Sequence, residues 1–487
     1  MSKFRPVADF DGSIARAYTP LPVKFTKLRD DDYVLTNVAG EFLTLPHSDL
    51  KAFVEGDLRP SEPSYVELKA RHFLTDDDSD VAFDLLALKL RTKLAALANF
   101  TGLHIFVTTL RCEHSCPYCQ VSRANDDRRE FDMSEETALK SLDLVFRSPS
   151  PAIKIEFQGG ESLLNLPLIR FVIEEAKRRN VTEQRDLAFV IATNLAVLDD
   201  EALDLCLRHD VLISTSLDGP EDLHNRNRPR PGNDSHARAI AGIRRARAML
   251  GHDRVGALMT TTAASLNRAR EIIDEYIAQD FGGIVLRPLS PYGFAIKTKS
   301  YQSYDQSRWL KFYFEGLDYI LDLNLAGFSF VEGYAAMVLR KMLTPFQPGY
   351  VDLRSPAGIA IGAIVYNYDG DVYASDESRM LAEMGDHSFR LGNVHRDSFE
   401  QLMLSEALLE PLESSFAESV PGCAWCAFEP WCGADPVFHH ATQGDAVGKK
   451  PLSGFCDRNM AIFRGLITRM QDRPGVRAIF ERWANQA

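Results

Sequence analysis

Short apolar runs recur six times between positions 103 and 289, and each run is followed by a stretch with helical spacing. The runs are rich in β-branched residues, which favour strands, and the stretches between them suit amphipathic helices, such as one expected over 134–146. This alternation predicts parallel strands covered by helices, and hence an α/β fold. Spacing alone leaves a doubly wound sheet and a complete or partial barrel open. The runs are LHIFVTT, AIKIEFQ, LAFVIA, VLISTS, VGALMTT and GIVLRPL.

Two other regions flank this βα pattern. Residues 20–75 read as short strands, YVLTN and EFLTL, around a turn at 37–40, followed by a helix over 47–56. This predicts a small separate unit, which could serve as a structural cap on the α/β domain. We expect an N-terminal domain over 1–98, an α/β domain over 99–300 and a C-terminal domain over 301–487.

Composition excludes several classes of protein. The 487 residues are 45% hydrophobic and 25% charged, as in soluble enzymes. A net charge of −13 would repel a phosphate backbone, so we expect no nucleic-acid partner. No apolar run approaches a membrane span, and the N-terminus MSKFRPVADF has no signal-peptide core. We therefore expect a cytoplasmic protein with no membrane partner and with reduced thiols.

Three of the eight cysteines, Cys112, Cys116 and Cys119, lie directly after the first strand-like run. This is the carboxyl end of a strand, where α/β proteins place their chemistry. Three thiolates can hold three irons of a [4Fe–4S] cluster and leave the fourth iron open, whereas a structural zinc site takes four closed ligands. The spacing thus favours a catalytic iron–sulfur site.

The motif CX3CX2C with Tyr118 before its last cysteine resembles the signature of radical S-adenosylmethionine (SAM) enzymes. One βα unit later, Gly159, Gly160 and Glu161 resemble the family's GGE motif, which implies that they bind the methionine amino group. The resemblance implies a partial (β/α)6 barrel and makes Cys112, Cys116 and Cys119 the ligands of the catalytic cluster.

Two later strand ends, TNLAVL and STSLDGPEDLHNRNR, resemble those of the peptide-modifying branch of this family. The resemblance implies that Asn194 and Ser216 contact the ribose and methionine end of SAM, and that Arg228 contacts its carboxylate. Asp218 has the alternative role of bonding its own turn. Asp376 and Glu377 serve either in proton transfer or substrate contact or simply as solvated loop acids, and the same choice is open for Arg287 and Tyr292 near the sixth strand end.

A second cysteine group, near the C-terminus, consists of Cys423, Cys426, Cys432 and Cys456. Four thiolates suggest a closed site, which suits zinc or an iron–sulfur cluster. The pattern resembles the SPASM extension of radical SAM enzymes, which implies an auxiliary [4Fe–4S] cluster. It also departs from SPASM, because Pro436 stands where a cysteine is expected, and so do Ser355 and Ala374 or Ser375 upstream. We therefore expect one auxiliary cluster, two clusters in all, and a buried structural role for the remaining Cys206.

The phrases LTNVAGEFLTLP, TLRCEHSCPYCQVSR and CGADP resemble the His-Xaa-Ser system radical SAM maturases. That resemblance implies a ribosomally made precursor peptide with His-Xaa-Ser repeats as substrate, and an external electron donor such as flavodoxin or ferredoxin. The N-terminal unit resembles the winged-helix peptide-recognition domains of natural-product pathways, which implies that a leader peptide adds a strand to its sheet edge. Two alternatives remain. One is a maturase that oxidises a Cys or Ser of a sulfatase-like protein, and the other is a zinc-stabilised peptide-binding module without catalysis.

Overall fold

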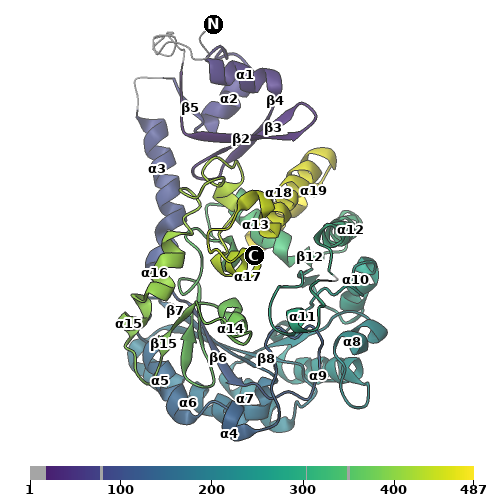
Figure 1. Cartoon of the computed structure of the whole chain (residues 1–487). Helices are drawn as coiled ribbons and strands as arrows, with labels where there is room; N and C mark the ends of the chain where they lie inside the picture. The colour runs from purple at the N-terminus through teal and green to yellow at the C-terminus, as the bar shows by residue number, and fades with distance from the viewer. Residues whose placement is uncertain (1–17, 77–79, 303, 348–350, 487) are drawn as a thin grey trace.

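The computed structural model describes residues 18–76, 80–302, 304–347 and 351–486 (Figure 1). The N-terminal stretch on which the expectation of no signal peptide rests lies outside these ranges. Within them, no helix combines the length and apolar character that a membrane crossing requires.

An eight-stranded sheet forms the centre of the protein, in the order β10-β9-β8-β7-β6-β13-β14-β15. Its first five strands are parallel, which confirms the α/β prediction. They coincide with the first five apolar runs: β6 (Leu103–Thr109), β7 (Ala152–Gly159), β8 (Asp186–Thr193), β9 (Leu212–Ser216) and β10 (Val255–Leu258).

Helices cover the outer face of the parallel strands, as the lower half of Figure 1 shows. They lie between successive strands in the chain, as expected of right-handed crossovers. One of them, α5, begins where the sequence predicts a helix, and Ser134 is its N-cap, with Oγ accepting from Thr137 N over 3.1 Å. The set is α5 (Glu135–Val145), α6 (Leu166–Glu183), α7 (Asp200–His209), α8 (Glu221–Asn227), α9 (Ser235–Leu250) and α10 (Ala269–Ala278).

The sixth apolar run differs from its prediction. Only Gly283–Ile284 is a strand, β11, and it pairs in parallel with β12 (Val331–Glu332) instead of β10. Two prolines, Pro288 and Pro291, follow closely, and proline cannot donate to a sheet ladder. The run is joined to the preceding strand end through Arg287, whose carbonyl accepts from Thr261 N over 3.0 Å. The barrel is therefore partial, as predicted, with a very short sixth strand.

The C-terminal region extends the same sheet beyond β6. β13 (Ala363–Tyr366) pairs with β6 in parallel, and β14 (Asp371–Tyr373) and β15 (Arg390–Asn393) follow antiparallel. The sheet thus crosses the expected boundary at 300, and the three domain ranges stay predictions. The helices of this region are α11 (Phe294–Lys297), α12 (Gln306–Leu325), α13 (Gly333–Leu343), α14 (Asp376–Ala382), α15 (Phe399–Met403), α16 (Glu406–Glu413), α17 (Pro436–Gln443), α18 (Gly454–Asp472) and α19 (Val476–Gln486).

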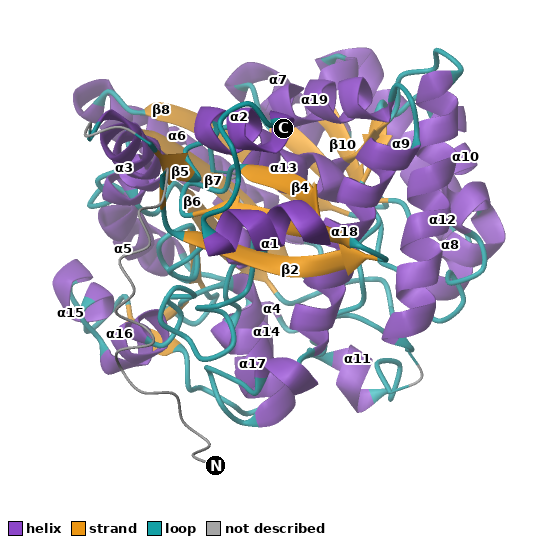
Figure 2. Ribbon diagram, turned by 90° about the horizontal axis from the view of Figure 1, so that it is seen from above, coloured by secondary structure: helices purple, strands orange, loops and turns teal. Residues whose placement is uncertain are grey.

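The N-terminal unit is a three-stranded antiparallel sheet with two helices and an apolar core of its own. It comprises β2 (Val23–Arg29), β3 (Asp32–Asn37), β4 (Phe42–Pro46), α1 (His47–Glu55) and α2 (Pro63–Ala70). Helix α3 (Val81–Leu94) connects it to the barrel (Figure 1). Seen from above, β2 and α1 lie over α13 and α18 (Figure 2), and Arg464 of α18 donates to the carbonyl of Lys27. The N-terminal unit therefore packs on the C-terminal region.

Candidate functional site

A cavity opens at the carboxyl ends of the parallel strands, beside the loop that carries Cys112, Cys116 and Cys119. The space open to the centres of water molecules is about 230 Å³, and we call it the cysteine-loop cavity. All but one of the predicted site residues of the barrel line it: Cys112, Cys116, Tyr118, Cys119, Gly159, Gly160, Asn194, Ser216 and Arg228. The exception is Glu161.

Contacts on both sides hold the cysteine loop in place. Before it, Arg111 pairs with Asp132 over 2.7 Å and also donates to the carbonyl of Leu164. Within and after it, Ser115 N donates to Pro229 O, and Phe294 N donates to Cys119 O, both over 2.8 Å. These bonds tie the loop to the segments that precede α5 and α6, to the segment that follows α8 and to the start of α11, so tertiary contacts set its conformation.

The thiols of the loop are better suited to metal binding than to remaining uncoordinated. Burial raises the pKa of Cys116 to about 12 and raises that of Cys112 as well, with Glu113 and Glu161 adding to the effect at Cys112. A thiolate at these positions therefore needs a compensating cation, which an iron of a cluster supplies. Three soft thiol ligands on the wall of a cavity fit a cluster with one open iron.

Close approach of the chain explains the glycines of the second motif. A Cβ on Gly159, whose φ is +152°, would lie 2.1 Å from Thr109 O, and one on Gly160 would lie 2.3 Å from Arg111 O. Gly160 N donates to Thr109 O over 2.8 Å. Glycine at these two positions lets β7 fit against the start of the cysteine loop. This packing explains the two glycines independently of any contact with a ligand.

Glu161 is buried, and both of its carboxylate oxygens accept hydrogen bonds within the protein. Oε1 accepts from Thr193 Oγ1 over 2.6 Å and from Leu163 N over 3.1 Å, and Oε2 accepts from Asn194 N over 2.8 Å. The carboxylate thus joins the ends of β7 and β8. Its role as a ligand of the SAM ammonium group stays a prediction.

Asp218 joins two of the predicted site residues. Its carboxylate is fully buried, pairs with Arg228 over 3.1 Å and accepts from Tyr118 Oη over 2.5 Å. The Arg228 guanidinium also lies 5.5 Å from the centre of the Tyr118 ring. Asp218 therefore fixes Arg228 and Tyr118 at the cavity wall. This role goes beyond the hydrogen bond within its own turn that the sequence suggested.

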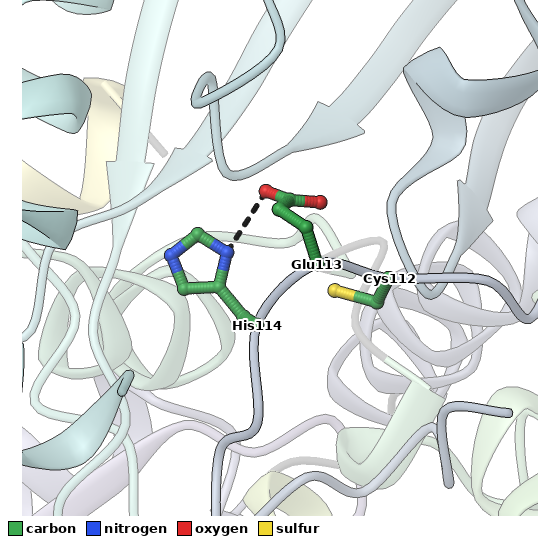
Figure 3. A group of neighbouring side chains, drawn as sticks. All are labelled: Cys112, Glu113 and His114. Atoms are coloured by element: carbon green, nitrogen blue, oxygen red, sulfur yellow. Dashed lines mark hydrogen bonds and ion pairs between the residues drawn. The ribbon is translucent and has the colours of Figure 1, made fainter. Parts of the chain in front are cut away.

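Two residues of the loop were missed by the sequence reasoning, Glu113 and His114. Figure 3 shows them with Cys112, and one atom of each lies within 4.8 Å of the others. His114 Nδ1 lies 2.9 Å from Glu113 Oε1 and 3.0 Å from Asn194 Nδ2. Because they fill the variable positions between the first two cysteines, no spacing rule marks them. Their contacts orient Asn194 at the cavity.

The cavity also receives Arg287 and Asp376, for which the sequence left the role open. Arg287 follows the short strand β11, and Asp376 is the first residue of α14 in the C-terminal region. Their meeting depends on the continuation of the sheet through β13 and β14, which no local pattern predicts.

The four C-terminal cysteines gather in one place. Cys432 and Cys456 are brought together by the loop before α17 and the first turn of α18. Burial raises the pKa of Cys456 to about 12, and its neighbours Cys432, Cys426 and Cys423 raise it further. Asn459 Nδ2 lies 3.6 Å from Cys432 Sγ. Cys206 lies apart, buried in α7 as expected of a core thiol.

The positions where SPASM cysteines are missing have structural roles. Pro436 is the first residue of α17, where its missing N–H costs nothing. Ser375 caps α14 by accepting from Ser378 N over 3.2 Å, and Ala374 is fully buried. Ser355 Oγ donates to Glu418 over 2.8 Å. None of these four residues offers a thiol to a further cluster.

Comparison with known proteins agrees with this geometry. Residues 106–262 match the family described as the Radical SAM superfamily. A cysteine-type anaerobic sulfatase-maturating enzyme of Clostridium perfringens is 22% identical over 331 residues, which are 64% of this chain and 83% of that protein. An uncharacterized protein of Methanothermobacter thermautotrophicus is 28% identical over 235 residues, which are 47% of this chain and 81% of that protein.

Two solved structures share the fold over most of the chain. Native anSMEcpe with bound AdoMet and Kp18Cys peptide aligns with a TM-score of 0.62 at 18% identity, covering 79% of this chain and 99% of the other. Streptococcus suis SuiB bound to precursor peptide SuiA aligns with a TM-score of 0.50 at 13% identity, covering 86% and 95%. At such identities the likeness establishes the fold and not the substrate.

The family match covers the strands that carry the cysteine loop, the glycine motif and Asn194, and the solved structures cover the C-terminal extension as well. This fold implies a [4Fe–4S] cluster and S-adenosylmethionine. Residues 106–262 therefore form a radical SAM domain of an enzyme, which argues against the non-catalytic zinc module considered from the sequence.

Proposed function

We propose that this enzyme is a peptide maturase, which modifies a ribosomally made precursor of the His-Xaa-Ser type. The observation that carries the proposal is the cysteine-loop cavity, where three thiols meet polar residues from four strand ends. A cavity of about 230 Å³ open to water centres leaves room for a substrate side chain beside a bound cofactor.

In this proposal Cys112, Cys116 and Cys119 hold the catalytic cluster, while Gly159, Gly160, Glu161, Asn194, Ser216 and Arg228 bind SAM and Tyr118 lines its site. The chemistry that these groups supply when bound is one-electron cleavage of the sulfonium bond and abstraction of a hydrogen atom from the substrate. The protein orients SAM and the substrate and excludes water from the site.

The protein's own contacts support that role. Arg228 is held by the fully buried Asp218, so its guanidinium is fixed toward a carboxylate ligand at little cost in side-chain entropy. Asn194 is fixed from both sides, because its backbone N–H donates to Glu161 and its amide lies 3.0 Å from His114. Pre-ordered polar groups of this kind favour binding of a small polar cofactor.

An auxiliary [4Fe–4S] cluster on Cys423, Cys426, Cys432 and Cys456 is part of the proposal. Zinc would also accept four thiolates, since both metals bind sulfur. We choose an iron–sulfur cluster because the cysteine pattern resembles the SPASM extension of radical SAM enzymes and because the chain carries a radical SAM domain.

A precursor peptide as substrate has two supports. The fold is shared with SuiB, which was solved with its precursor peptide SuiA, and with anSMEcpe, which was solved with a peptide. The N-terminal unit also has a small antiparallel sheet with β2 and β4 as its edge strands, and addition of a leader as a further strand requires such an edge. We place the enzyme in the cytoplasm, with flavodoxin or ferredoxin as its electron donor.

The test is anaerobic reconstitution with iron and sulfide, followed by incubation with SAM and dithionite. We expect 5′-deoxyadenosine, and with a precursor peptide encoded beside the enzyme we expect a mass change confined to the peptide core. Iron-loaded protein that cleaves SAM but leaves every such precursor unchanged would refute the peptide assignment.

A second candidate has specific support. The match to the Clostridium perfringens sulfatase-maturating enzyme spans 83% of that protein, and the fold match to anSMEcpe spans 99%. The same cavity would then oxidise one Cys or Ser of a sulfatase-like protein. A sulfatase-derived 18-residue peptide with Cys or Ser at the target position distinguishes the two, since this candidate predicts its oxidation to the aldehyde.

A further inference from the structure

A second cavity adjoins the cysteine-loop cavity on the side of the C-terminal region. Arg287 lines both, and the first turn of α14 separates them, since Asp376 lines the cysteine-loop cavity and Glu377 the second one. The space open to water centres in the second cavity is about 50 Å³, which is room for about four water molecules. A group the size of one small ring would fill it.

Aromatic side chains form much of its wall, namely Tyr292, Trp309, Tyr334 and Phe438, and we call it the aromatic cavity. Aromatic faces and edges pack well against a flat ring. The shape of the wall therefore favours a planar group over a branched or extended one.

Two of these side chains bury hydrogen-bond donors that have no partner in the described part of the protein, Tyr292 Oη and Trp309 Nε1. Both residues are only 1% exposed. An unpaired buried donor costs free energy, so a ligand that accepts hydrogen bonds from these two groups would be stabilised in this cavity.

The carboxylates of Asp352, Glu377 and Asp435 also line the aromatic cavity, beside the guanidinium groups of Arg287 and Arg458. Burial raises the pKa of both Glu377 and Asp435 to about 7. Buried carboxylates are stabilised by N–H donors. A ligand that donates as well as accepts would therefore bond to the carboxylates and to the two unpaired donors together.

The hydrogen-bonding capacity of each chemical group limits which ligand the aromatic cavity can bind. Guanidinium and ammonium groups only donate, a carboxylate only accepts and would meet three others, and a phenyl ring does neither. A carboxamide does both but is not a ring that fills an aromatic wall. A neutral imidazole is a flat ring with one N–H donor and one acceptor nitrogen.

We infer that the aromatic cavity binds the imidazole of a histidine in the substrate peptide and so sets a nearby residue of that peptide in the cysteine-loop cavity. This inference rests on the proposed function. The imidazole N–H donates to Glu377 or Asp435, and the other nitrogen accepts from Tyr292 or Trp309. Arg287, shared by the two cavities, lies where the peptide passes from one to the other.

The probe is 4-methylimidazole, with toluene and N-methylguanidinium as comparisons, on the full-length protein with its clusters reconstituted. Dissociation constants come from ligand-observed NMR. We expect 4-methylimidazole to bind more tightly than either comparison, and Asp435→Asn and Tyr292→Phe each to weaken it at least tenfold. Asparagine retains the helix cap that Asp435 Oδ1 forms with Phe438 N over 2.8 Å, so the variant keeps the fold. The matched control is Asp305→Asn, which alters the capping residue of α12 outside the cavity and should leave binding unchanged.

Binding of 4-methylimidazole no tighter than that of the comparisons, or equally tight in the wild type and both variants, overturns the inference. Cleavage of SAM by the wild type is measured separately. Cleavage of SAM without binding of 4-methylimidazole refutes this inference alone. Binding of 4-methylimidazole without cleavage of SAM supports the aromatic cavity as an imidazole site and refutes the proposed function.

Discussion

The indole N–H of Trp431 donates to the backbone carbonyl of Gly40 over 2.8 Å. Trp431 directly precedes Cys432, and Gly40 lies in the turn between β3 and β4, so this bond ties the N-terminal unit to the C-terminal cysteine loop. Two further bonds join the same parts, since Thr36 Oγ1 donates to Ala427 O over 2.6 Å and Lys24 pairs with Glu429 over 2.6 Å. Metal loading of the cysteine loop and docking of the N-terminal unit are therefore expected to depend on each other.

Cys432→Ala should remove the auxiliary cluster and loosen this docking, because metal binding contributes folding free energy to its loop. We expect about four irons fewer per chain and faster amide hydrogen exchange across residues 23–46. The matched control is Cys206→Ala, which changes a buried cysteine far from both groups. Unchanged exchange in an iron-depleted Cys432→Ala protein would disconnect the cluster from the docking.

Trp431→Phe should weaken the docking without removing a thiol. The variant keeps an aromatic ring against Phe42, whose centroid lies 5.2 Å away, but loses the bond to Gly40. We expect the free energy of unfolding to fall by about 1 kcal/mol, measured by urea denaturation, with the iron content unchanged. Trp425→Phe, at a tryptophan that is 85% exposed, serves as control and should match the wild type.

Replacing Cys112, Cys116 and Cys119 together by alanine should leave about four irons, those of the auxiliary cluster, and abolish formation of 5′-deoxyadenosine. The reason is that these three thiols line the cysteine-loop cavity while the other cysteines do not. Chromatographic detection of 5′-deoxyadenosine in the triple variant would show that the radical site is elsewhere.

Phe25→Asp should weaken binding of a precursor peptide more than it alters cleavage of SAM. Phe25 is 46% exposed on the edge strand β2, so a leader that adds a strand there would cover its ring. We expect at least a tenfold rise in the peptide dissociation constant by fluorescence anisotropy. Phe328→Asp is the matched control, because Phe328 is 45% exposed and lies between α12 and β12. Equal affinities in both variants would favour the structural-cap interpretation of the N-terminal unit.

Acid should destabilise the fold through His104. Burial lowers the pKa of His104 to about 3 in the folded protein, whereas the pKa in the unfolded chain is about 6.5. Below about pH 6.5 the unfolded chain therefore binds a proton that the folded protein does not, and the free energy of unfolding decreases as the pH is lowered. From pH 7.5 to 5.5 this costs about 1 kcal/mol. His104→Asn should therefore lose less stability over that interval than the wild type, measured by urea denaturation. His252→Asn, at a half-exposed side chain, should behave like the wild type.

Local patterns determined much of this protein. The apolar runs predicted five of the parallel strands, because strand residues that are buried on both faces must be apolar wherever they occur. The spacing of Cys112, Cys116 and Cys119 predicted a cluster site within one loop, and the structure places all three thiols at the cysteine-loop cavity. The spacing of Cys423, Cys426 and Cys432 likewise predicted a second site, which stays a prediction, whereas Cys456 is distant in sequence and is brought near only by the fold.

Tertiary structure alone decided how residues distant in sequence meet. Glu161 is bound by Thr193 and Asn194, and Asp218 joins Tyr118 to Arg228, since each strand end is set by its neighbours in the sheet and not by its own residues. The aromatic cavity depends on β13 and β14 continuing the sheet beyond β6, which places α14 beside Arg287. The docking of the turn at Gly40 on Trp431 spans 391 positions. Such contacts form only when apolar surfaces from separate regions are buried against each other, and hydrophobic burial is non-directional, so no short pattern specifies the partner.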